Sequence, residues 1–430
     1  MKKYLFILLL VVNQFIQAQD FSIDGVYRPR IEFRDLVPAS GLDPITLASH
    51  RMRLIVNYKN DTTGIKTRFV LQDARVWGNT SLSPTGDNNS FGVYEAWGQY
   101  NFTPKFSVKA GRQEIVYDSE EIFGLSDIQQ QGLTHDAVLF EYKGKTEITL
   151  AGAYNNNTPL LQLYNAPYTL SNYKNLQFIR IGKTTAKFKG NFMLVNNGLE
   201  YYAKGKTDSI KTNYYQTMGV YFKYLLNTRF FTTNSFYYQR GTDQFNLSLK
   251  AFSIDSKFSY VAKPGVSILS VGLNVFSGNN KNTPANENNS YTEPYGSMLL
   301  TTGLPGYYTV LNPTGKPGIN KGLIQPKAEM LLLLKKLSIL TVMHLPFSYG
   351  ELYDAQNNKT GRFLGAEYEI MATYQISKEV KFNLLVAHYF MGGDVENLSS
   401  PFFGKYSNFK RDPFWAICGL TFTPGFFKSK

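Results

Sequence analysis

Apolar and polar residues alternate along most of the chain. In the segment 21–34, FSIDGVYRPRIEFR, one face carries three arginines, an aspartate and a glutamate, whereas the other face is apolar, with Phe21, Ile23, Tyr27, Ile31 and Phe33. Side chains in a β-strand point alternately to opposite faces. The segment therefore predicts a strand with one apolar and one charged face. A membrane barrel needs this pattern, with apolar residues outside and polar residues inside.

The same alternation recurs along the chain in segments that we also predict as strands. The predicted strands are 21–34, 50–59, 65–72, 91–102, 106–111, 136–142, 147–154, 176–182, 186–196, 213–224, 229–240, 244–260, 267–277, 323–334, 337–347, 363–375, 380–390 and 414–422. The count is about 18, an even number within the range of single-chain outer-membrane barrels.

The connections between these strands alternate between long and short. Long connections such as 118–135 and 278–322 are each followed by a short one, and only 241–243 is short where a long one is expected. Outer-membrane barrels have short periplasmic turns and longer extracellular loops, and closure leaves no unpaired strand edge in lipid. We therefore predict an all-β fold, a transmembrane antiparallel β-barrel over residues 19–430. The long loop 278–322 is a candidate constriction or lid.

The composition fits strands of alternating apolar and polar residues, whose average hydropathy is moderate, rather than membrane-spanning helices. Aromatic residues make up 15% of the 430 residues and charged residues 18%, and the mean hydropathy is −0.25. Residues 1–18 begin with two lysines and continue with an apolar run that is too short to span a bilayer as a helix. This pattern predicts a signal peptide over 1–18 and export to the outer membrane of a Gram-negative cell. The single cysteine, Cys418, lies in an apolar run and is expected to face lipid or to be packed.

The formal net charge is +13, and the basic residues are concentrated in the first five predicted strands. Export argues against nucleic acid as the partner and favours an anionic solute. Gly111 permits a bulge that would turn Arg112 inward. The basic residues of these strands lie mostly on the predicted inward face, with the acids Asp73 and Glu95 among them. They include Arg28, Arg30, Arg34, Arg51, Arg53, Arg68, Arg75 and Lys109.

Such a row of arginines raises the local concentration of anions, because the planar guanidinium matches carboxylate and phosphate geometry. Interleaved acids would keep a polyanion from binding too tightly to leave. The alternative is that arginine–carboxylate ladders fill the lumen and stiffen the barrel.

Several short motifs in the first third of the chain resemble those of the alginate export family. They are Arg51-x-Arg53, Gln72-Asp73-Ala74-Arg75-x-Trp77-Gly78, Tyr94-Glu95-Ala96, Gly111-Arg112-Gln113 and His135-Asp136-Ala137-Val138. The resemblance implies an outer-membrane barrel of eighteen strands whose founding member secretes alginate, a polyuronate. It also implies an electropositive constriction lined here by Arg51, Arg53, Asp73, Arg75, Glu95, Arg112 and Gln113.

Motifs for catalysis or for metal and cofactor binding are missing from the sequence. The four histidines show no metal-ligand spacing, and no serine stands in a G-x-S-x-G context. The chain also has no phosphate-binding glycine loop and no dinucleotide fingerprint. We therefore expect no enzyme activity, no metal and no cofactor.

Three functions remain open from the sequence. The first is a channel for anionic solutes, extending to acidic oligo- or polysaccharides. The second is a nutrient porin for small solutes, and the third is a non-conducting barrel that acts as an enzyme or an anchor. Secretion of a polyuronate would also require periplasmic export partners.

Overall fold

The computed structural model describes residues 19–36, 43–78, 91–156, 173–202, 210–297, 321–354, 356–393, 395, 399–400, 404–405 and 412–429. The predicted signal peptide, residues 1–18, lies outside the described residues. No helix in the described part of the chain has the length and apolarity needed to cross a bilayer.

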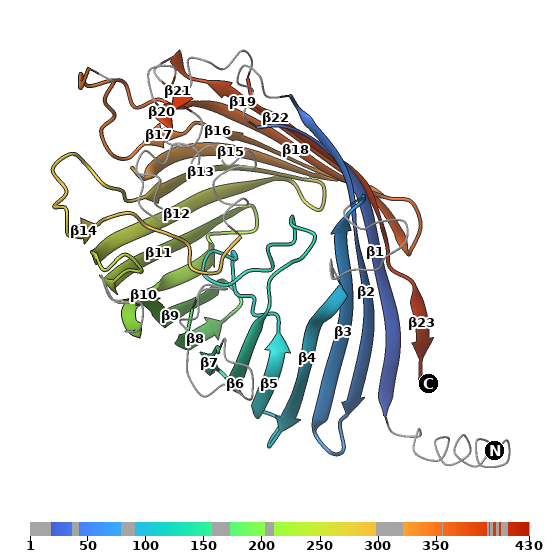
Figure 1. The fold of residues 1–430 in the computed structure, drawn as a ribbon. Helices are drawn as coiled ribbons and strands as arrows, with labels where there is room; N and C mark the ends of the chain where they lie inside the picture. Colours follow the sequence, from blue (N-terminus) through green and yellow to red (C-terminus); the bar gives the residue numbers. More distant parts are fainter. Residues whose placement is uncertain are drawn as a thin grey trace, which may run out of the picture.

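Eighteen long strands form the wall of a barrel (Figure 1). They are β1 (Asp20–Asp35), β2 (Ile45–Asn60), β3 (Ile65–Val76), β4 (Phe91–Asn101), β5 (Phe106–Gln113), β6 (His135–Lys143), β7 (Glu147–Tyr154), β8 (Asn175–Thr184), β9 (Phe188–Tyr202), β10 (Ile210–Leu225), β11 (Phe230–Thr242), β12 (Ser248–Lys263), β13 (Ser267–Phe276), β15 (Leu323–Leu333), β16 (Leu337–His344), β18 (Gly365–Gln375), β19 (Val380–Met391) and β22 (Phe414–Phe422). Each of them overlaps one of the strands predicted from the alternation, so the predicted fold class is confirmed.

Every long strand pairs antiparallel with the next one, and β22 pairs with β1 to close the sheet. The closing register places Tyr27 opposite Phe422 and Ile31 opposite Cys418. A short C-terminal strand, β23 (Gly425–Lys428), extends the pairing along β1. Shorter pieces lie in the long loops: β14 (Glu287–Asn288), β17 (Phe347–Ser348), β20 (Ser399–Ser400) and β21 (Gly404–Lys405). Closure pairs the backbone groups that an open edge would expose to lipid.

Alternation along each strand separates an apolar outer face from a polar inner face. Ile31, Met52 and Val271 point outward and are 59%, 53% and 60% exposed, whereas Glu32 and Gln113 point inward and are fully buried. Cys418 is exposed opposite Ile31, on the lipid-facing side. Aromatic rings gather at the short-turn end, where Phe102 lies against Tyr100 and Phe106. Such girdles mark the membrane interface in barrels of this kind.

Two long loops fold into the barrel instead of extending from it. Residues 114–134, between β5 and β6, run inside the wall (Figure 1), and residues 277–297 after β13 pack against them. Phe123 of the first loop and Tyr295 of the second form a β-bridge and belong to a buried apolar cluster inside the barrel. The sequence predicts a constriction from the loop 278–322 alone, whereas in the structure the loop 114–134 also lies inside the barrel. Residues 298–320 of the predicted constriction lie outside the described residues.

An arginine placed on the outer face should destabilise the barrel in lipid. Val271 lies midway along β13 on the outer face. In Val271→Arg a charge faces lipid, which lowers the stability of the barrel by about 2–4 kcal/mol near the bilayer midplane. The matched control, Leu334→Arg, lies in a short turn at the interface, where the cost is about 0–1 kcal/mol. Urea unfolding from lipid vesicles measures both. Equal stabilities of the two variants would contradict the assigned outer face.

Candidate solute pathway at the arginine wall

Four arginines of the first two strands form what we call the arginine wall: Arg28, Arg30, Arg51 and Arg53. Arg28 of β1 stands directly opposite Arg51 of β2, and Arg53 stands opposite Val26. The outward residues of the same strands, Tyr27 and Met52, are exposed. Alternation therefore places all four guanidinium groups on the lumen side, as the sequence predicts.

The loop 114–134 docks on this wall through Asp127. One carboxylate oxygen of Asp127 accepts a hydrogen bond from Arg28 at 2.9 Å, and the other accepts one from Arg51 at 2.6 Å. Partial burial alone would raise the pKa of Asp127, but Arg28 and Arg51 outweigh it and hold the pKa below its ordinary value. Asp127 is therefore ionised at neutral pH and ties the loop to two arginines at once.

Backbone and amide groups of the same loop complete the docking. Arg30 donates a hydrogen bond to the carbonyl oxygen of Ile128, and Arg28 donates one to the side-chain oxygen of Gln130. Gln130 in turn donates to the hydroxyl of Ser49 on β2 at 3.2 Å. The arginine wall thus faces the lumen and also holds the loop across it.

The remaining predicted residues of β1, β3, β4 and β5 pair within the wall. Glu32 is fully buried between Arg30 and Arg34, with nearest distances of 2.6 and 2.5 Å. Arg68 pairs with Glu95 at 2.6 Å. Lys109 lies over the ring of Trp97, with the ammonium 4.0 Å from the ring centroid. These contacts confirm the inward orientation of Arg34, Arg68, Glu95 and Lys109.

Tyr94 is a lumen residue that alternation assigns to the outer face. The register between β3 and β4 shifts beside Val70 and Leu71, so Tyr94 is an extra residue and turns inward beside Glu95. The guanidinium of Arg53 lies 3.5 Å from its ring centroid, and its hydroxyl donates to Glu114 at 2.9 Å. A bulge re-aims one side chain without a clear signal in the sequence.

Two other predicted pore residues, Asp73 and Arg75, face outward. Asp73 is paired in register with the exposed Met52, and Arg75 with His50, on the outer side of β2. Arg75 pairs with Asp73 at 2.8 Å, and the other oxygen of Asp73 lies 3.0 Å from His50. Trp77 donates to the second ring nitrogen of His50. These polar groups satisfy one another outside the barrel, so their predicted place in the pore is wrong.

Arg112 also faces outward, where it pairs with Asp136 at 2.8 Å. The registers of β5 with β4 and with β6 run through Gly111 without a shift, so no bulge turns Arg112 inward. Gly111 has φ = 124°, and a Cβ there would lie 2.2 Å from the carbonyl oxygen of Ala96. The glycine therefore serves close packing between strands rather than re-aiming of its neighbour.

Gln113 points inward as predicted but does not line an open surface. It is fully buried, and its amide nitrogen donates to the carbonyl oxygens of Gly111 and Ala137. The bond to Ala137 holds the start of the loop 114–134 against β6, and the bond to Gly111 lies within β5. Gln113 is therefore a structural residue of the wall.

On the opposite side of the lumen the same loop docks through Glu121. Its carboxylate accepts hydrogen bonds from Ser119 at 2.5 Å and from Ser235 of β11 at 2.6 Å. Burial and the nearby Asp255 raise the pKa of Glu121 to about 7, against the smaller lowering effect of Lys327. The loop is thus held by arginines on one wall and by a hydroxyl on the other.

The second inward loop, 277–297, braces the first. Gly124 donates to the carbonyl of Tyr295 at 2.9 Å, and Ser297 donates to the carbonyl of Glu120 at 2.8 Å. A Cβ at Gly296 would lie 2.2 Å from the carbonyl oxygen of Glu121, so the two loops meet backbone to backbone. Tyr295 also donates to Asn197 of β9. The constriction is therefore built from two mutually supporting loops.

The wall opposite the arginines carries carboxylates and lysines in pairs. Lys257 of β12 pairs with Glu329 of β15 at 2.9 Å, and Lys327 pairs with Asp255 at 3.2 Å. Two further carboxylates, Glu367 and Glu369, are buried on β18, which only β19 and β22 separate from β1. The lumen therefore lies between a wall dominated by arginine and one of mixed charge, an arrangement that would orient dipolar and charged molecules.

Within the described residues, no group of three or more histidine, cysteine, aspartate or glutamate side chains is placed to hold a metal ion. The geometry offers paired charges and hydrogen-bonding groups along a lumen. It supports electrostatic guidance of a solute.

Comparison with known proteins relates the chain to outer-membrane porins through its structure. No family model and no curated protein matches the sequence. Among solved structures, OpdL of Pseudomonas aeruginosa aligns with a TM-score of 0.61 at 11% identity, covering 95% of this chain and 99% of its own. OccAB4 of Acinetobacter baumannii aligns with a TM-score of 0.59 at 11% identity, covering 95% and 99%.

OpdK of Pseudomonas aeruginosa, whose crystal structure contains vanillate, aligns with a TM-score of 0.60 at 9% identity and covers 96% of this chain and 100% of its own. The chain therefore has the fold of an outer-membrane β-barrel porin. These structural neighbours are porins, and the comparisons give no support to the resemblance with the alginate export family.

Removing the charge of Asp127 should change the selectivity of the pore. In Asp127→Asn, Arg28 and Arg51 lose their shared anion, and the arginine wall becomes more positive. The Coulomb energy of a unit charge at about 4 Å is on the order of 1 kcal/mol in water, so anion selectivity should rise up to several-fold. Reversal potentials in planar bilayers measure it.

Asp136→Asn is the matched control, because it removes a carboxylate from an arginine pair on the outer face. Its selectivity should equal that of the wild type. A change of the same size in both variants would contradict the assignment of the two faces.

Docking of the loop 114–134 should depend on pH through Glu121. Docking raises the pKa of this acid from 4.5 to about 7, so protonation of Glu121 stabilises the docked loop. This stabilisation is complete below about pH 4.5 and is lost as the pH rises through about 7. Current fluctuations should therefore increase with pH, and Glu121→Gln should remove most of the dependence. Glu351→Gln is the control, because the pKa of Glu351 is about 2 and its charge is constant over this range. An unchanged pH profile in Glu121→Gln would refute the assignment.

Proposed function

We propose that this protein is an outer-membrane porin through which small anionic solutes, above all small carboxylates, diffuse past the arginine wall. The observation that carries the proposal is the placement of Arg28, Arg30, Arg51 and Arg53 on one side of a lumen that the loop 114–134 narrows. Guanidinium groups bind carboxylates with matched geometry, and paired acids keep that binding weak enough for release.

The inward loops favour small solutes over a polysaccharide. Asp127, Ile128 and Gln130 occupy hydrogen-bonding positions of the arginine wall that a polyuronate chain would need. The structural neighbour OpdK was crystallised with vanillate, a small aromatic carboxylate. Both observations support a small-solute porin, and passage of alginate is not part of the proposal.

The surroundings of the protein follow from the same proposal. The apolar outer face requires outer-membrane lipid around the barrel, and residues 1–18 would direct export and then be removed. Passive diffusion requires no cofactor, no catalytic group and no periplasmic export partner.

Reversal of one lumen charge should reduce anion selectivity. In Arg53→Glu, a guanidinium that contacts Tyr94 on the lumen side becomes a carboxylate. A change of two unit charges near the path should lower the anion-to-cation permeability ratio several-fold, on the basis of about 1 kcal/mol per charge pair at 4 Å in water. Bilayer recordings in a salt gradient measure the ratio, and liposome swelling with small carboxylates measures solute flux.

Arg75→Glu provides the control, because Arg75 lies on the outer face of β3. Its permeability ratio should match that of the wild type. Loss of selectivity in Arg75→Glu but not in Arg53→Glu would overturn the proposed path, and absence of any conductance would overturn the porin itself.

A further inference from the structure

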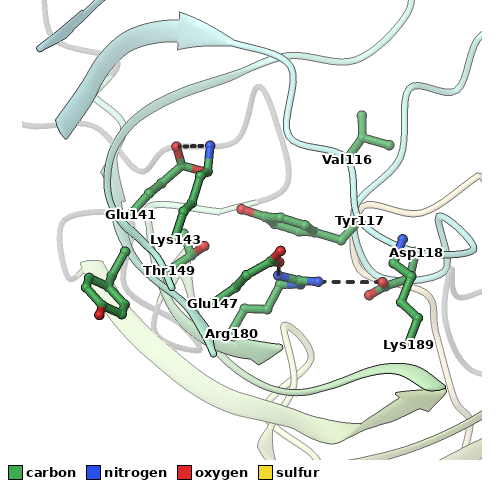
Figure 2. Close-up of a pocket in the computed structure, with 10 residues that line it drawn as sticks. Val116, Tyr117, Asp118, Glu141, Lys143, Glu147, Thr149, Arg180 and Lys189 are labelled. Atoms are coloured by element: carbon green, nitrogen blue, oxygen red, sulfur yellow. Dashed lines mark hydrogen bonds and ion pairs between the residues drawn. The ribbon is translucent and has the colours of Figure 1, made fainter. Parts of the chain in front are cut away.

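A pocket of about 220 Å³ lies at the short-turn end of the lumen, between the start of the loop 114–134 and the inner faces of β6 to β9 (Figure 2). Tyr117 and Asp118 of the loop form one side. The strand side carries five charged residues and two residues with hydroxyl groups, namely Glu141, Tyr142, Lys143, Glu147, Thr149, Arg180 and Lys189. The pocket is separate from the arginine wall, which is formed by β1 and β2.

One guanidinium is fixed deep in this pocket. Arg180 lies 3.3 Å from Glu147 and 3.8 Å from Asp118, and its guanidinium carbon lies 4.9 Å from the ring centroid of Tyr117. The side chains of Arg180 and Asp118 are only 8% and 4% exposed. These two groups form the rigid base of the pocket rather than its accessible surface.

The accessible charges are of both signs. Lys143, which pairs with Glu141 at 3.2 Å, has a side chain that is 63% exposed, and the side chain of Glu147 is 46% exposed. Lys189 is exposed and has no ion pair within the described residues. A solute therefore meets two ammonium groups and one carboxylate, above a base that is itself paired.

The balance of charge restricts what this pocket can bind. Its lining holds three cations and three carboxylates, namely Lys143, Arg180 and Lys189 against Asp118, Glu141 and Glu147. Arg180 is shared between Glu147 and Asp118, so a simple anion would face the exposed and only partly neutralised carboxylate of Glu147, and a simple cation would face both lysines. Each of these mismatches costs affinity, whereas a molecule with one charge of each sign meets attraction at both ends.

We propose that this pocket is a solute subsite for small zwitterions of amino-acid size. The carboxylate of the solute binds to Lys189, its ammonium binds to Glu147, and its apolar part lies against the ring of Tyr117. The inference rests on the proposed function, because a solute reaches the pocket through the lumen.

Three probes of equal chain length test the proposal: norvaline, pentanoate and pentylamine. Binding to the full-length protein purified in detergent is measured by isothermal titration calorimetry. Norvaline should bind about tenfold more tightly than either singly charged probe, which corresponds to about 1.4 kcal/mol. Equal affinities for the three probes would overturn the proposal.

Two variants and one control assign the contacts. Glu147→Gln should abolish the preference for norvaline over pentanoate, whereas Lys189→Gln should weaken norvaline and pentanoate alike. The control is Lys145→Gln, because Lys145 lies in the short turn between β6 and β7 but does not line the pocket. This variant should bind norvaline as the wild type does. Folding of Glu147→Gln is checked by the heat-dependent migration of the barrel in gel electrophoresis. If the folded variant keeps the norvaline preference, the subsite is refuted. If Glu147→Gln does not fold, Lys189→Gln decides, because unchanged binding there refutes the subsite equally.

Calorimetry also separates this subsite from the porin function. Binding that prefers norvaline in a barrel without conductance would support the pocket and refute the porin. Conductance without that preference would support the porin and refute the pocket.

Discussion

The structure depends on the need to pair every backbone polar group in the membrane. In hydrocarbon an open sheet edge is too costly, so the sheet must close, and here β22 pairs with β1 to do so. Closure then fixes two faces for every strand. Apolar residues such as Ile31 and Val271 must point out, and charged residues such as Glu32 must point in. Charged residues are concentrated in the lumen because lipid surrounds the barrel and disfavours charge on its outer face.

A lumen rich in charge needs internal partners, and the loop 114–134 supplies them. Asp127 pairs with Arg28 and Arg51, and Glu121 bonds to Ser235 on the far wall. The two anchors hold the loop across the barrel. Apolar side chains such as Phe123 then fill the space behind it. The same contacts that stabilise the loop also narrow the lumen and set its electrostatic field.

The sequence predicts the wall of this barrel well because the wall obeys a period of two. All eighteen long strands overlap segments with alternating residues, and the long and short connections fall at opposite ends. The inward orientation of Arg28, Arg51 and Arg53 follows from the same period. The same period places Asp73 and Arg75 on the outer face with Phe69 and Leu71. Their predicted place in the pore rested on the family resemblance, and in the structure they pair with each other and with His50 outside the barrel.

Departures from the regular ladder were not predictable in this way. Tyr94 turns inward because one bulge in β4 shifts the parity, and Arg112 stays outward because no bulge occurs at Gly111. Apolar and polar residues do not alternate regularly in the loop 114–134. Its docking through Asp127 and Glu121 therefore depends on contacts that only the folded barrel creates. Its apolar residues, among them Ile115, Ile122 and Phe123, are the signal in the sequence that this loop is buried.

The loop 114–134 docks on the arginine wall inside the barrel, and the field of the lumen depends on this docking. The most direct test replaces Ser49 and Gln130, whose side chains are 3.2 Å apart, by cysteine in a Cys418→Ser background, and treats the protein in lipid with a short bifunctional thiol reagent. The docked loop predicts efficient cross-linking of this pair, and no cross-linking when Met52, on the outer face of β2, replaces Ser49 as the cysteine position. Cysteines at 49 and 130 that each react singly but never cross-link would contradict the docked loop.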